Sequence, residues 1–225
     1  MRFTLAAMTA ATGIVAAAGQ AHAQSGWYIS GSAGALFTTD TTAPGTIYSS
    51  SGLHASDTTT SSYNPGFTLG AAIGHRLPLG FRAELELGYL HNSLDTRTLH
   101  TAGTVFSALN GTKLTSPDGG DRNRFTVTAN LFYDLPVSFA GVTPYVGAGV
   151  GYYHLDVGDA HFATPILFTA KGYDTSNAVI LAEVGVTAAI APGLSVVPAY
   201  RYEHYFGSEA DEDSHQIKIG LRYDF

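Results

Sequence analysis

The sequence predicts an all-β fold, an eight-stranded antiparallel transmembrane β-barrel whose strands follow one another in an up-and-down meander. First, apolar and polar residues alternate in eight segments, which is the pattern of strands with one apolar and one polar face. Second, the connections between these segments alternate between long and short, as they do in membrane barrels. Third, the chain is 45% hydrophobic but only 13% charged, whereas soluble domains carry roughly 25% charged residues.

The first 23 residues predict a secretory signal peptide. Arg2 gives a basic start, an apolar run extends from Leu5 to Ala18, and Ala21-His22-Ala23 is an A-x-A cleavage site. We expect cleavage after Ala23, so that residues 24–225 form the barrel. An uncleaved anchor is the alternative, and the short, threonine-rich run disfavours it. The remaining chain contains no apolar segment of the roughly 20 residues that a membrane-spanning helix needs.

The first four strands are predicted between residues 26 and 133. Residues 26–37 place Trp27 and Phe37 on one apolar row, and residues 66–76 alternate in the same way. Residues 81–90 read FRAELELGYL, in which charged residues separate the apolar ones, and a fourth row runs from Phe125 to Tyr133. Each segment has about ten residues, which is enough for a tilted strand to cross the bilayer core.

The last four strands are predicted between residues 143 and 225. Residues 143–155 read TPYVGAGVGYYHL, and residues 178–188 carry the sixth apolar row. The seventh strand runs from Leu194 to about Phe206, and the last one is HQIKIGLRYDF at residues 215–225. Because hydrocarbon offers no partners for the backbone groups of an open edge, we expect the last strand to pair with the first and close the ring.

The lengths of the connections predict which end of the barrel faces outward. We expect the long segments to lie outside the cell, and they are residues 38–62, 96–122, 158–176 and 207–214. The short segments are then periplasmic turns, at residues 77–80, 135–141 and 191–193. The long segments lack periodicity, and we expect them to be loops that carry any recognition, because loops on a rigid scaffold tolerate variation.

Aromatic residues predict two bands at the edges of the membrane. The band at the turn end comprises Trp27, Phe81, Tyr133, Tyr223 and Phe225, and the band at the loop end comprises Phe37, Phe67, Tyr89, Phe125 and Tyr152. All of them lie on the apolar rows of their strands. A soluble eight-stranded barrel is the alternative. It would turn the apolar rows inside and leave the two bands without a physical reason.

Charged residues of both signs share the opposite rows. An eight-stranded barrel is just wide enough for side chains to fill its interior. We therefore expect a lumen network that, with Arg76 on the same row, consists of Arg82, Glu84, Glu86, Arg124, Glu183, Arg201, Glu203, Lys218 and Arg222. Counting back from the hairpin connections predicts that Glu183 faces Arg201 and that Glu203 faces Lys218. Two interpretations stay open: a plug that fixes the register, or the gate of a narrow pore.

With these rows assigned, the sequence resembles a known family: the small eight-stranded outer-membrane proteins of Gram-negative bacteria, of the opacity and surface-antigen type, distant relatives of OmpA and OmpX. The resemblance covers nearly all of residues 26–225 and is clearest in FRAELELGYL, TPYVGAGVGYYHL, VPAYRYEHYF and SHQIKIGLRYDF. It implies an outer-membrane location, contact with membrane lipid and lipopolysaccharide, no cofactor and a monomer. It also implies that Tyr223 and Phe225 belong to a signal read by the barrel-assembly machinery. With no residues after Phe225, we expect the barrel alone.

Three functions follow as hypotheses. The first is a structural and surface-interaction barrel, with a role in envelope integrity or adhesion, whose four loops contact a ligand such as a host surface molecule. The second is a narrow passive pore gated by the lumen network. The third is a lipid-A-modifying enzyme, since one such family places a His-x-Ser pair and a carboxylate on the lipid face. Here His91 and Ser93 have the required parity and Asp121 is the nearest carboxylate. This spacing alone is weak support for a nucleophile and its base, so we expect no enzyme.

Composition disfavours several other kinds of chemistry. The formal charge of −7 argues against a nucleic-acid partner, and a chain without cysteine has no disulfide or thiolate metal site. We expect no metal site among the scattered histidines, which after cleavage are His54, His75, His91, His100, His154, His161, His204 and His215. Within residues 208–213 and their acidic run of Glu209, Asp211, Glu212 and Asp213, we expect a solvated loop. Weak divalent-cation binding is the alternative.

Overall fold

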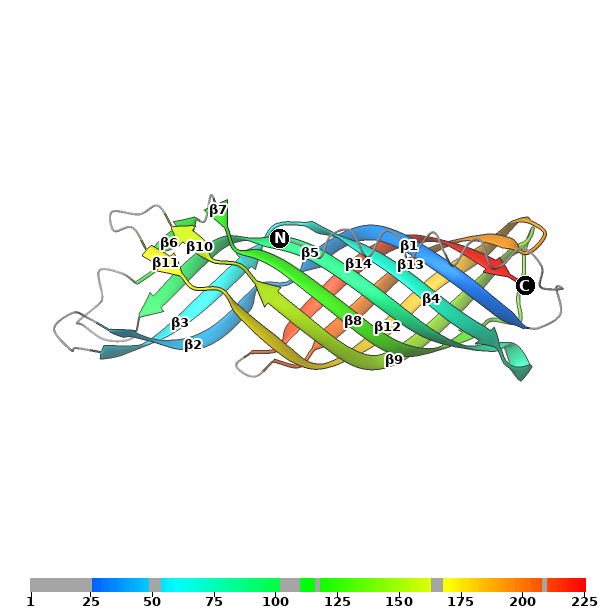
Figure 1. The fold of residues 1–225 in the computed structure, drawn as a ribbon, viewed down its shortest axis with the longest axis horizontal. Coiled ribbons are helices and arrows are strands. Elements are labelled where there is room, and N and C mark those ends of the chain that lie inside the picture. Colours follow the sequence, from blue (N-terminus) through cyan, green and yellow to red (C-terminus); the bar gives the residue numbers. More distant parts are fainter. Residues whose placement is uncertain (1–25, 49–53, 102–109, 116–117, 163–167, 208–209) are drawn as a thin grey trace, which may run out of the picture.

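The computed structural model describes residues 26–48, 54–101, 110–115, 118–162, 168–207 and 210–225. A closed antiparallel ring of tilted strands dominates it (Figure 1). In ring order the strands are β1 (Trp27–Thr38), β4 (Gly66–Arg76), β5 (Phe81–Thr101), β8 (Asp121–Asp134), β9 (Val142–Val157), β12 (Tyr173–Ala191), β13 (Leu194–Tyr205) and β14 (Glu212–Asp224). The eight-stranded meander is thus confirmed. The signal peptide lies outside the described residues and stays a prediction.

The last strand closes the ring by pairing with the first, as the sequence predicts. The β1–β14 ladder runs from Tyr28↔Asp224 to Thr38↔Ser214 without a break, and β5 joins β8 on the other side of the ring. Every barrel strand therefore has two neighbours. The backbone N–H and C=O groups of the ring are satisfied within the sheet, which is the condition for strands to cross hydrocarbon.

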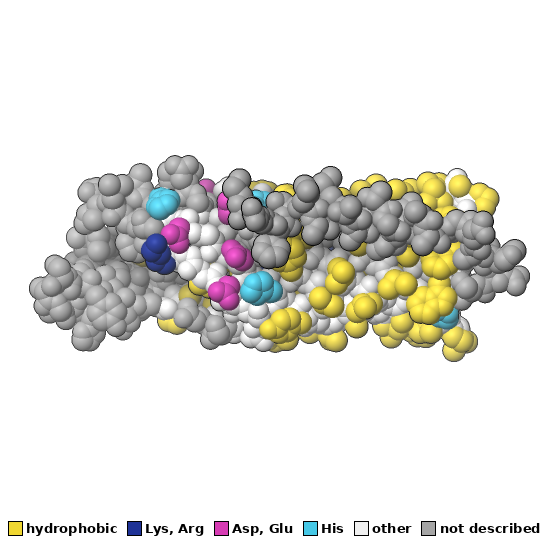
Figure 2. Space-filling model, viewed as in Figure 1, with side chains coloured by type: hydrophobic (Ala, Val, Ile, Leu, Met, Phe, Trp, Pro, Cys, Tyr) yellow, Lys and Arg dark blue, Asp and Glu magenta, His cyan; other side chains and the backbone are white. Residues whose placement is uncertain are grey.

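The apolar rows face outward and the charged rows face the lumen. Leu87 and Ile217 are 59% and 62% exposed, whereas Arg201 and Glu203 are 4% and 1% exposed. Figure 2 shows the exposed hydrophobic side chains gathered over the barrel toward its turn end, with Asp, Glu and His side chains grouped toward the other end. A soluble barrel has the reverse arrangement, so that alternative is wrong.

The aromatic bands are confirmed. The ten aromatic side chains assigned to them are all exposed or half-buried. Neighbouring rings touch across strands: the Phe81 and Tyr133 centroids lie 5.0 Å apart at the turn end, and those of Tyr89 and Phe125 lie 5.0 Å apart at the loop end. The bands mark the two edges of the apolar belt, where aromatic rings of membrane barrels lie.

Short connections close the turn end. The first contains the 3₁₀ helix η2 (Pro78–Gly80), in which Leu79 and Gly80 have φ of 64° and 83°. Gly193 has φ of 73° in the turn between β12 and β13, and glycine adopts this left-handed conformation at little cost. No helix in the described part of the chain is long and apolar enough to cross a membrane.

The prediction that the long segments are loops is wrong for most of their described residues. They form β2 (Thr41–Tyr48), β3 (His54–Tyr63), β6 (Lys113–Thr115), β7 (Asp118–Gly119), β10 (Ala160–Phe162) and β11 (Phe168–Ala170). The hairpin β2–β3 pairs with the part of β5 that extends beyond the ring, and β6 pairs with β5 from the other side. Figure 1 shows these strands projecting beyond the loop end of the barrel. Threonine favours strands, but a strand that is polar on both faces leaves no apolar period in the sequence.

Two polar contacts hold together the ends of the third long segment, residues 158–176. The backbone N–H of Gly172 donates to Asp159 Oδ1 at 2.7 Å, and Lys171 Nζ lies 3.1 Å from Asp159 Oδ2. The Gly172 N–H and, after it, the Lys171 ammonium lower the pKa of the Asp159 carboxyl, because both interactions favour its charged form. The segment between β9 and β12 therefore returns to the barrel at a fixed point.

The two predicted cross-strand pairs have different outcomes. Glu183 faces Arg201 between β12 and β13, as predicted. The other prediction is wrong, because Glu203 faces Ser214 and Lys218 faces Ala199. The sequence pattern places the start of β14 at residue 215, whereas it begins at Glu212. The acidic residues 212 and 213 join the strand because each finds a partner on the barrel wall, and this shifts the register.

Candidate functional site

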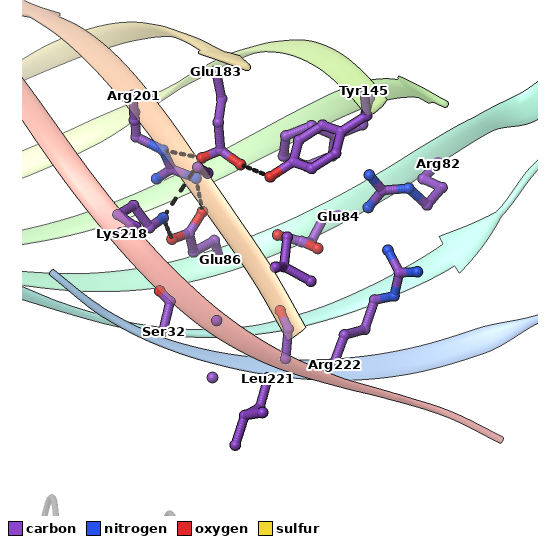
Figure 3. Close-up of a pocket in the computed structure, with 16 residues that line it drawn as sticks. Ser32, Arg82, Glu84, Glu86, Tyr145, Glu183, Arg201, Lys218, Leu221 and Arg222 are labelled. Atoms are coloured by element: carbon purple, nitrogen blue, oxygen red, sulfur yellow. Dashed lines mark hydrogen bonds and ion pairs between the residues drawn. The ribbon is translucent and has the colours of Figure 1, made fainter. Parts of the chain in front are cut away.

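The lumen contains a central layer of ion pairs around Arg201. Its guanidinium lies between two carboxylates: Nη2 is 2.5 Å from Glu86 Oε2 and Nε is 2.6 Å from Glu183 Oε2. Lys218 Nζ lies 3.0 Å from Glu86 Oε1 and 3.6 Å from Glu183 Oε2. Figure 3 shows these four side chains converging from β5, β12, β13 and β14, so the layer connects opposite walls of the barrel.

Neutral side chains add hydrogen bonds to the carboxylates of this layer. The Tyr145 hydroxyl donates to Glu183 Oε1 at 2.7 Å, and Asn130 Nδ2 donates to Glu86 Oε2 at 3.1 Å. Glu203 lies 3.5 Å from Arg201 Nη1 and accepts hydrogen bonds from Gln216 and Tyr205. Buried charges are tolerated only when they are paired and hydrogen-bonded in this way, so the arrangement fixes each side chain in place.

A second layer lies nearer the loop end. Glu212 accepts hydrogen bonds from both Arg122 and Arg124, and all three side chains are buried. The Arg124 guanidinium stacks 3.8 Å from the centroid of the Tyr205 ring, and that of Arg122 lies 4.3 Å from the centroid of Tyr63. These contacts cover the cations with aromatic faces, which attract them. The lumen network therefore ends under β3, a strand of the projecting sheet.

A third layer lies at the turn end. Arg82 Nε lies 3.0 Å from Asp134, and its Nη1 is 3.3 Å from the Tyr28 hydroxyl. Arg222 Nε lies 3.4 Å from Asp224, which also binds Arg76 at 2.8 Å. Arg76 is the exception to the inward prediction, because its side chain is 43% exposed at the mouth of the barrel.

A small cavity of about 50 Å³ separates the central layer from the layer at the turn end. Glu84 lines it, together with Arg82, Tyr145 and Arg222 (Figure 3). The Glu84 carboxylate interacts with the Tyr28 hydroxyl. A volume of this size holds a few water molecules, far less than the aqueous channel of a general porin.

Inward glycines make room for larger neighbours. A Cβ on Gly149 would lie 2.0 Å from Asn130 Oδ1, and one on Gly147 would lie 2.1 Å from the Phe132 ring. The space is used by side chains of the adjacent strand β8. The glycine row of β9 is therefore part of the lumen packing.

All nine predicted lumen residues lie inside the barrel, although their roles are unequal. The structure joins Glu86, Glu183, Arg201, Glu203 and Lys218 in one layer, and it distributes Arg82, Glu84, Arg124 and Arg222 among the other layers and the cavity. The sequence reading missed Arg122, Asp134, Glu212 and Asp224. Arg122 has the same parity as Arg124, so extending that strand by two positions would have found it. Glu212 was hidden because it was assigned to a loop.

The acidic run of the last connection is a solvated loop only in part, because Asp211 is 57% exposed outside the strand whereas Glu212 and Asp213 belong to β14. Glu212 is buried on the arginines, and Asp213 accepts hydrogen bonds from the Tyr202 hydroxyl and from His204 Nδ1, both at 2.7 Å. Glu209 lies outside the described residues. Among the residues that the structure describes, no group of three or more His, Asp or Glu side chains could hold a metal ion.

The candidate pair of His91 and Ser93 is not assembled as a catalytic site. His91 Nδ1 bonds Asn123 Oδ1 at 3.0 Å, and Ser93 Oγ accepts a hydrogen bond from Asn64 at 3.2 Å. Asp121 faces Ser93 across β5 and β8, but within the described residues no hydrogen bond joins it to His91. A base, a nucleophile and an orienting acid need mutual contacts, so this site gives the enzyme hypothesis no support.

The terminal aromatic residues lie on the exposed row at the turn end. The rings of Tyr223 and Phe225 stack with centroids 6.5 Å apart, and the Phe225 N–H donates to the Trp27 carbonyl at 3.0 Å. The end of the chain is thus fixed to the start of β1. A role of these residues as an assembly signal stays a prediction.

Comparisons with known proteins agree with this architecture. The model of the outer membrane protein beta-barrel domain matches residues 3–225. Neisserial surface protein A has 18% identity and a TM-score of 0.53, with 89% of this chain and 98% of that chain covered. The outer membrane protein OprG from Pseudomonas aeruginosa has 13% identity and a TM-score of 0.55, with coverages of 88% and 96%. No curated protein matches the sequence.

Proposed function

We propose, since this chain belongs to the family of outer membrane protein beta-barrel domains, that it is a closed surface-interaction barrel of the outer membrane. In this proposal the ring is a rigid anchor in the lipid, and the projecting sheet is an extracellular surface that contacts other molecules. The role is structural and adhesive rather than catalytic.

The observation that carries the proposal is the division of the molecule into a filled ring and a projecting sheet. Three layers of ion pairs fill the lumen, and the cavity between two of them has a volume of about 50 Å³. Beyond the loop-end aromatic band, β2, β3, the end of β5 and β6 form a continuous sheet. Binding functions tend to lie on connections held by a rigid scaffold, and here the connections are themselves ordered strands.

The surface of the β2–β3 hairpin is better suited to a polar ligand than to an apolar one. Thr42 and Pro44 are exposed on β2, and the hydroxyls of Thr42 and Thr60 lie 3.1 Å apart across the hairpin. Hydroxyl groups both donate and accept hydrogen bonds. A row of them on a flat sheet is suited to hydrogen bonding with another polar surface, such as a glycan or a protein.

The proposal is tested by replacing residues 41–62 with a short Gly-Asn turn and measuring adhesion of cells that display the protein. We expect adhesion to fall severalfold while the protein still shifts with heating on gels as a folded barrel does. Unchanged adhesion with a folded barrel would contradict the proposal. A matched control shortens the turn at residues 136–140, which should leave adhesion unchanged.

A narrow pore is the second candidate, and one observation favours it. The central layer closes the lumen with ion pairs and hydrogen bonds rather than with apolar packing, and such contacts rearrange more readily than a close-packed core. In planar bilayers the closed barrel should be silent, and Arg201→Ala should produce openings. Steady openings of the wild-type protein would favour the pore over the closed barrel.

A further inference from the structure

A Tyr-x-His sequence recurs on three of the four strands that run toward the loop end. The copies are Tyr89 and His91 in β5, Tyr152 and His154 in β9, and Tyr202 and His204 in β13. Residues two positions apart lie on the same face of a strand. Each histidine therefore lies on the outer face, two residues beyond a tyrosine at the loop end of the apolar belt. Neither the closed lumen nor the projecting sheet accounts for this repeat.

Each of these histidines bonds the residue directly opposite on the next strand. His91 Nδ1 lies 3.0 Å from Asn123 Oδ1, His154 Nδ1 lies 2.8 Å from Ser176 Oγ, and His204 Nδ1 lies 2.7 Å from Asp213 Oδ1. All three pairs occupy matching positions in their ladders. The partners differ in charge, because the first two are neutral and the third is a carboxylate.

The histidines lie where lipid phosphates are expected. Aromatic bands of membrane barrels lie at the interface between hydrocarbon and head groups, and the histidines come immediately beyond the band. On the outward rows between the turns and these histidines, the described residues include no lysine or arginine. Histidine is therefore the only basic side chain that this face offers to a head group at that level.

The hydrogen bond made by His91 Nδ1 determines whether the other ring nitrogen, Nε2, can donate a hydrogen bond. The amide oxygen of Asn123 is an acceptor and already takes a hydrogen bond from the Tyr89 hydroxyl at 2.7 Å, so His91 Nδ1 must be a donor. A neutral imidazole with a donor at Nδ1 has only a lone pair at Nε2. An ionised phosphate oxygen is an acceptor, so it can bond Nε2 only after the ring takes up a second proton.

We propose that protonated His91 and His154 bind the phosphate groups of anionic lipids in the outer leaflet, so that the barrel holds these lipids more tightly as the pH falls. The proposal rests on the membrane location and is independent of the adhesive role. Histidine is the side chain whose charge changes between about pH 5 and 8, which places the effect in a range that a bacterial surface meets.

Aromatic, polar and acidic side chains surround the two histidines. His91 is flanked by the Phe67 ring on β4, by Tyr89 on its own strand, and by Asn123 and then Asp121 on β8. His154 faces Phe125 on β8 and Ser176 on β12, with Tyr152 on its own strand. Asp156 and Asp174 come one position further from the membrane. These carboxylates lie on the side away from the lipid.

His204 is an internal control provided by the molecule. Its Nδ1 is bonded to Asp213, and its Nε2 lies 3.7 Å from Asp211 Oδ2. Nearby, His215 stacks on Tyr200 and bonds its hydroxyl at 2.6 Å. A positive charge on His204 is balanced by carboxylates of the protein, so we expect this residue to add little to lipid binding.

The test counts lipids that stay bound to the purified full-length protein in native mass spectrometry. Micelles contain phosphatidylglycerol, whose phosphodiester stays singly charged across the range used, or phosphatidylcholine with the same acyl chains. EDTA is present so that no divalent cation links a phosphate to an aspartate. We expect roughly fivefold more phosphatidylglycerol bound at about pH 5.5 than at about pH 8, and no change for phosphatidylcholine.

Variants assign the effect to the two histidines. The double variant His91→Gln/His154→Gln should lose the pH dependence, and His204→Gln should keep it. Ser176→Asp leaves His154 in place but gives it the partner that His204 has, and it should reduce the pH dependence by about half. All variants are checked for the heat-dependent gel shift of a folded barrel. A pH-independent wild type, a double variant that behaves as the wild type, or an equal rise with phosphatidylcholine would overturn the proposal.

Discussion

At the scale of single residues, Arg201 is the centre of the lumen network. Its side chain contacts Glu86, Glu183 and Glu203 and is 4% exposed. Removing one partner of a buried ion pair leaves an uncompensated charge in a poorly hydrated site, and this usually costs more than the pair contributes. We therefore expect this residue to contribute to the stability of the barrel and to the closure of the lumen.

Replacing Arg201 by alanine should lower the free energy of unfolding by about 3–5 kcal/mol. The measurement is urea unfolding in detergent, followed by the fluorescence of Trp27, the single tryptophan of the chain. Arg76→Ala is the control, because that side chain is 43% exposed and exposed pairs contribute about 0–1 kcal/mol. A loss no larger for Arg201→Ala than for Arg76→Ala would show that the central layer does not hold the barrel.

The sequence predicts which side chains point inward, and it predicts the pair of Glu183 and Arg201 on neighbouring strands, but it does not predict the contacts across the lumen. Parity follows from alternation and needs only one strand at a time, so the nine lumen residues could be assigned from the sequence. A contact such as Lys218 with Glu86 joins β14 to β5 across the lumen, and it depends on the stagger of all strands in between. No local pattern in the sequence contains that information.

At the scale of elements, the outer end of β14 is held by its own acidic residues. Glu212 points inward to two arginines, and Asp213 points outward to Tyr202 and His204. The same two residues look like a solvated loop in the sequence, because acidic residues have low strand propensity. Tertiary partners outweigh that propensity, which is why the predicted register of β13 and β14 was wrong.

Glu212→Ala should loosen this end of the barrel. Arg122 and Arg124 would be buried without their counter-charge, which should cost about 3 kcal/mol, and the hairpin around residues 206–211 should be cut faster by a protease. Asp174→Ala is the control, because that side chain is exposed on β12, away from this connection. Equal cleavage rates for the two variants would mean that Glu212 does not hold the hairpin.

The outward row gives a second prediction at this scale. Val184 is 51% exposed near the middle of β12, so Val184→Arg should destabilise the barrel in a lipid bilayer by about 2–4 kcal/mol. Val137 is 59% exposed in a turn, and Val137→Arg should have little effect. The measurement is the unfolding midpoint in liposomes. Similar midpoints for both variants would indicate that β12 does not face lipid.

The projecting strands were the least predictable elements. The segment 41–63 has a strand-forming composition but no apolar row in its sequence. The pairing of β3 with β5 could be inferred only from the fact that β5 continues beyond the apolar belt to Thr101. The amphipathic strands were predictable because they have lipid on one side and a charged lumen on the other. This arrangement requires apolar and polar residues to alternate in the sequence.

At the scale of the whole molecule, the ring is the part that lies in the lipid, and the projecting sheet is the part to which we assign recognition. The ring buries its charges and exposes its apolar rows, so it is stable only with lipid around it. The sheet at the loop end is polar and lies outside the apolar belt. The histidines of the outer face lie at the boundary, where the lipid head groups meet the protein.

The orientation of this arrangement is tested most directly by labelling single cysteines in intact cells with a membrane-impermeant maleimide. The chain contains no cysteine, so each introduced thiol is labelled alone. We predict strong labelling of Thr42→Cys in the projecting sheet, and labelling of Val137→Cys in the turn only after the outer membrane is permeabilised. Labelling of Val137→Cys in intact cells, with Thr42→Cys protected, would contradict the account.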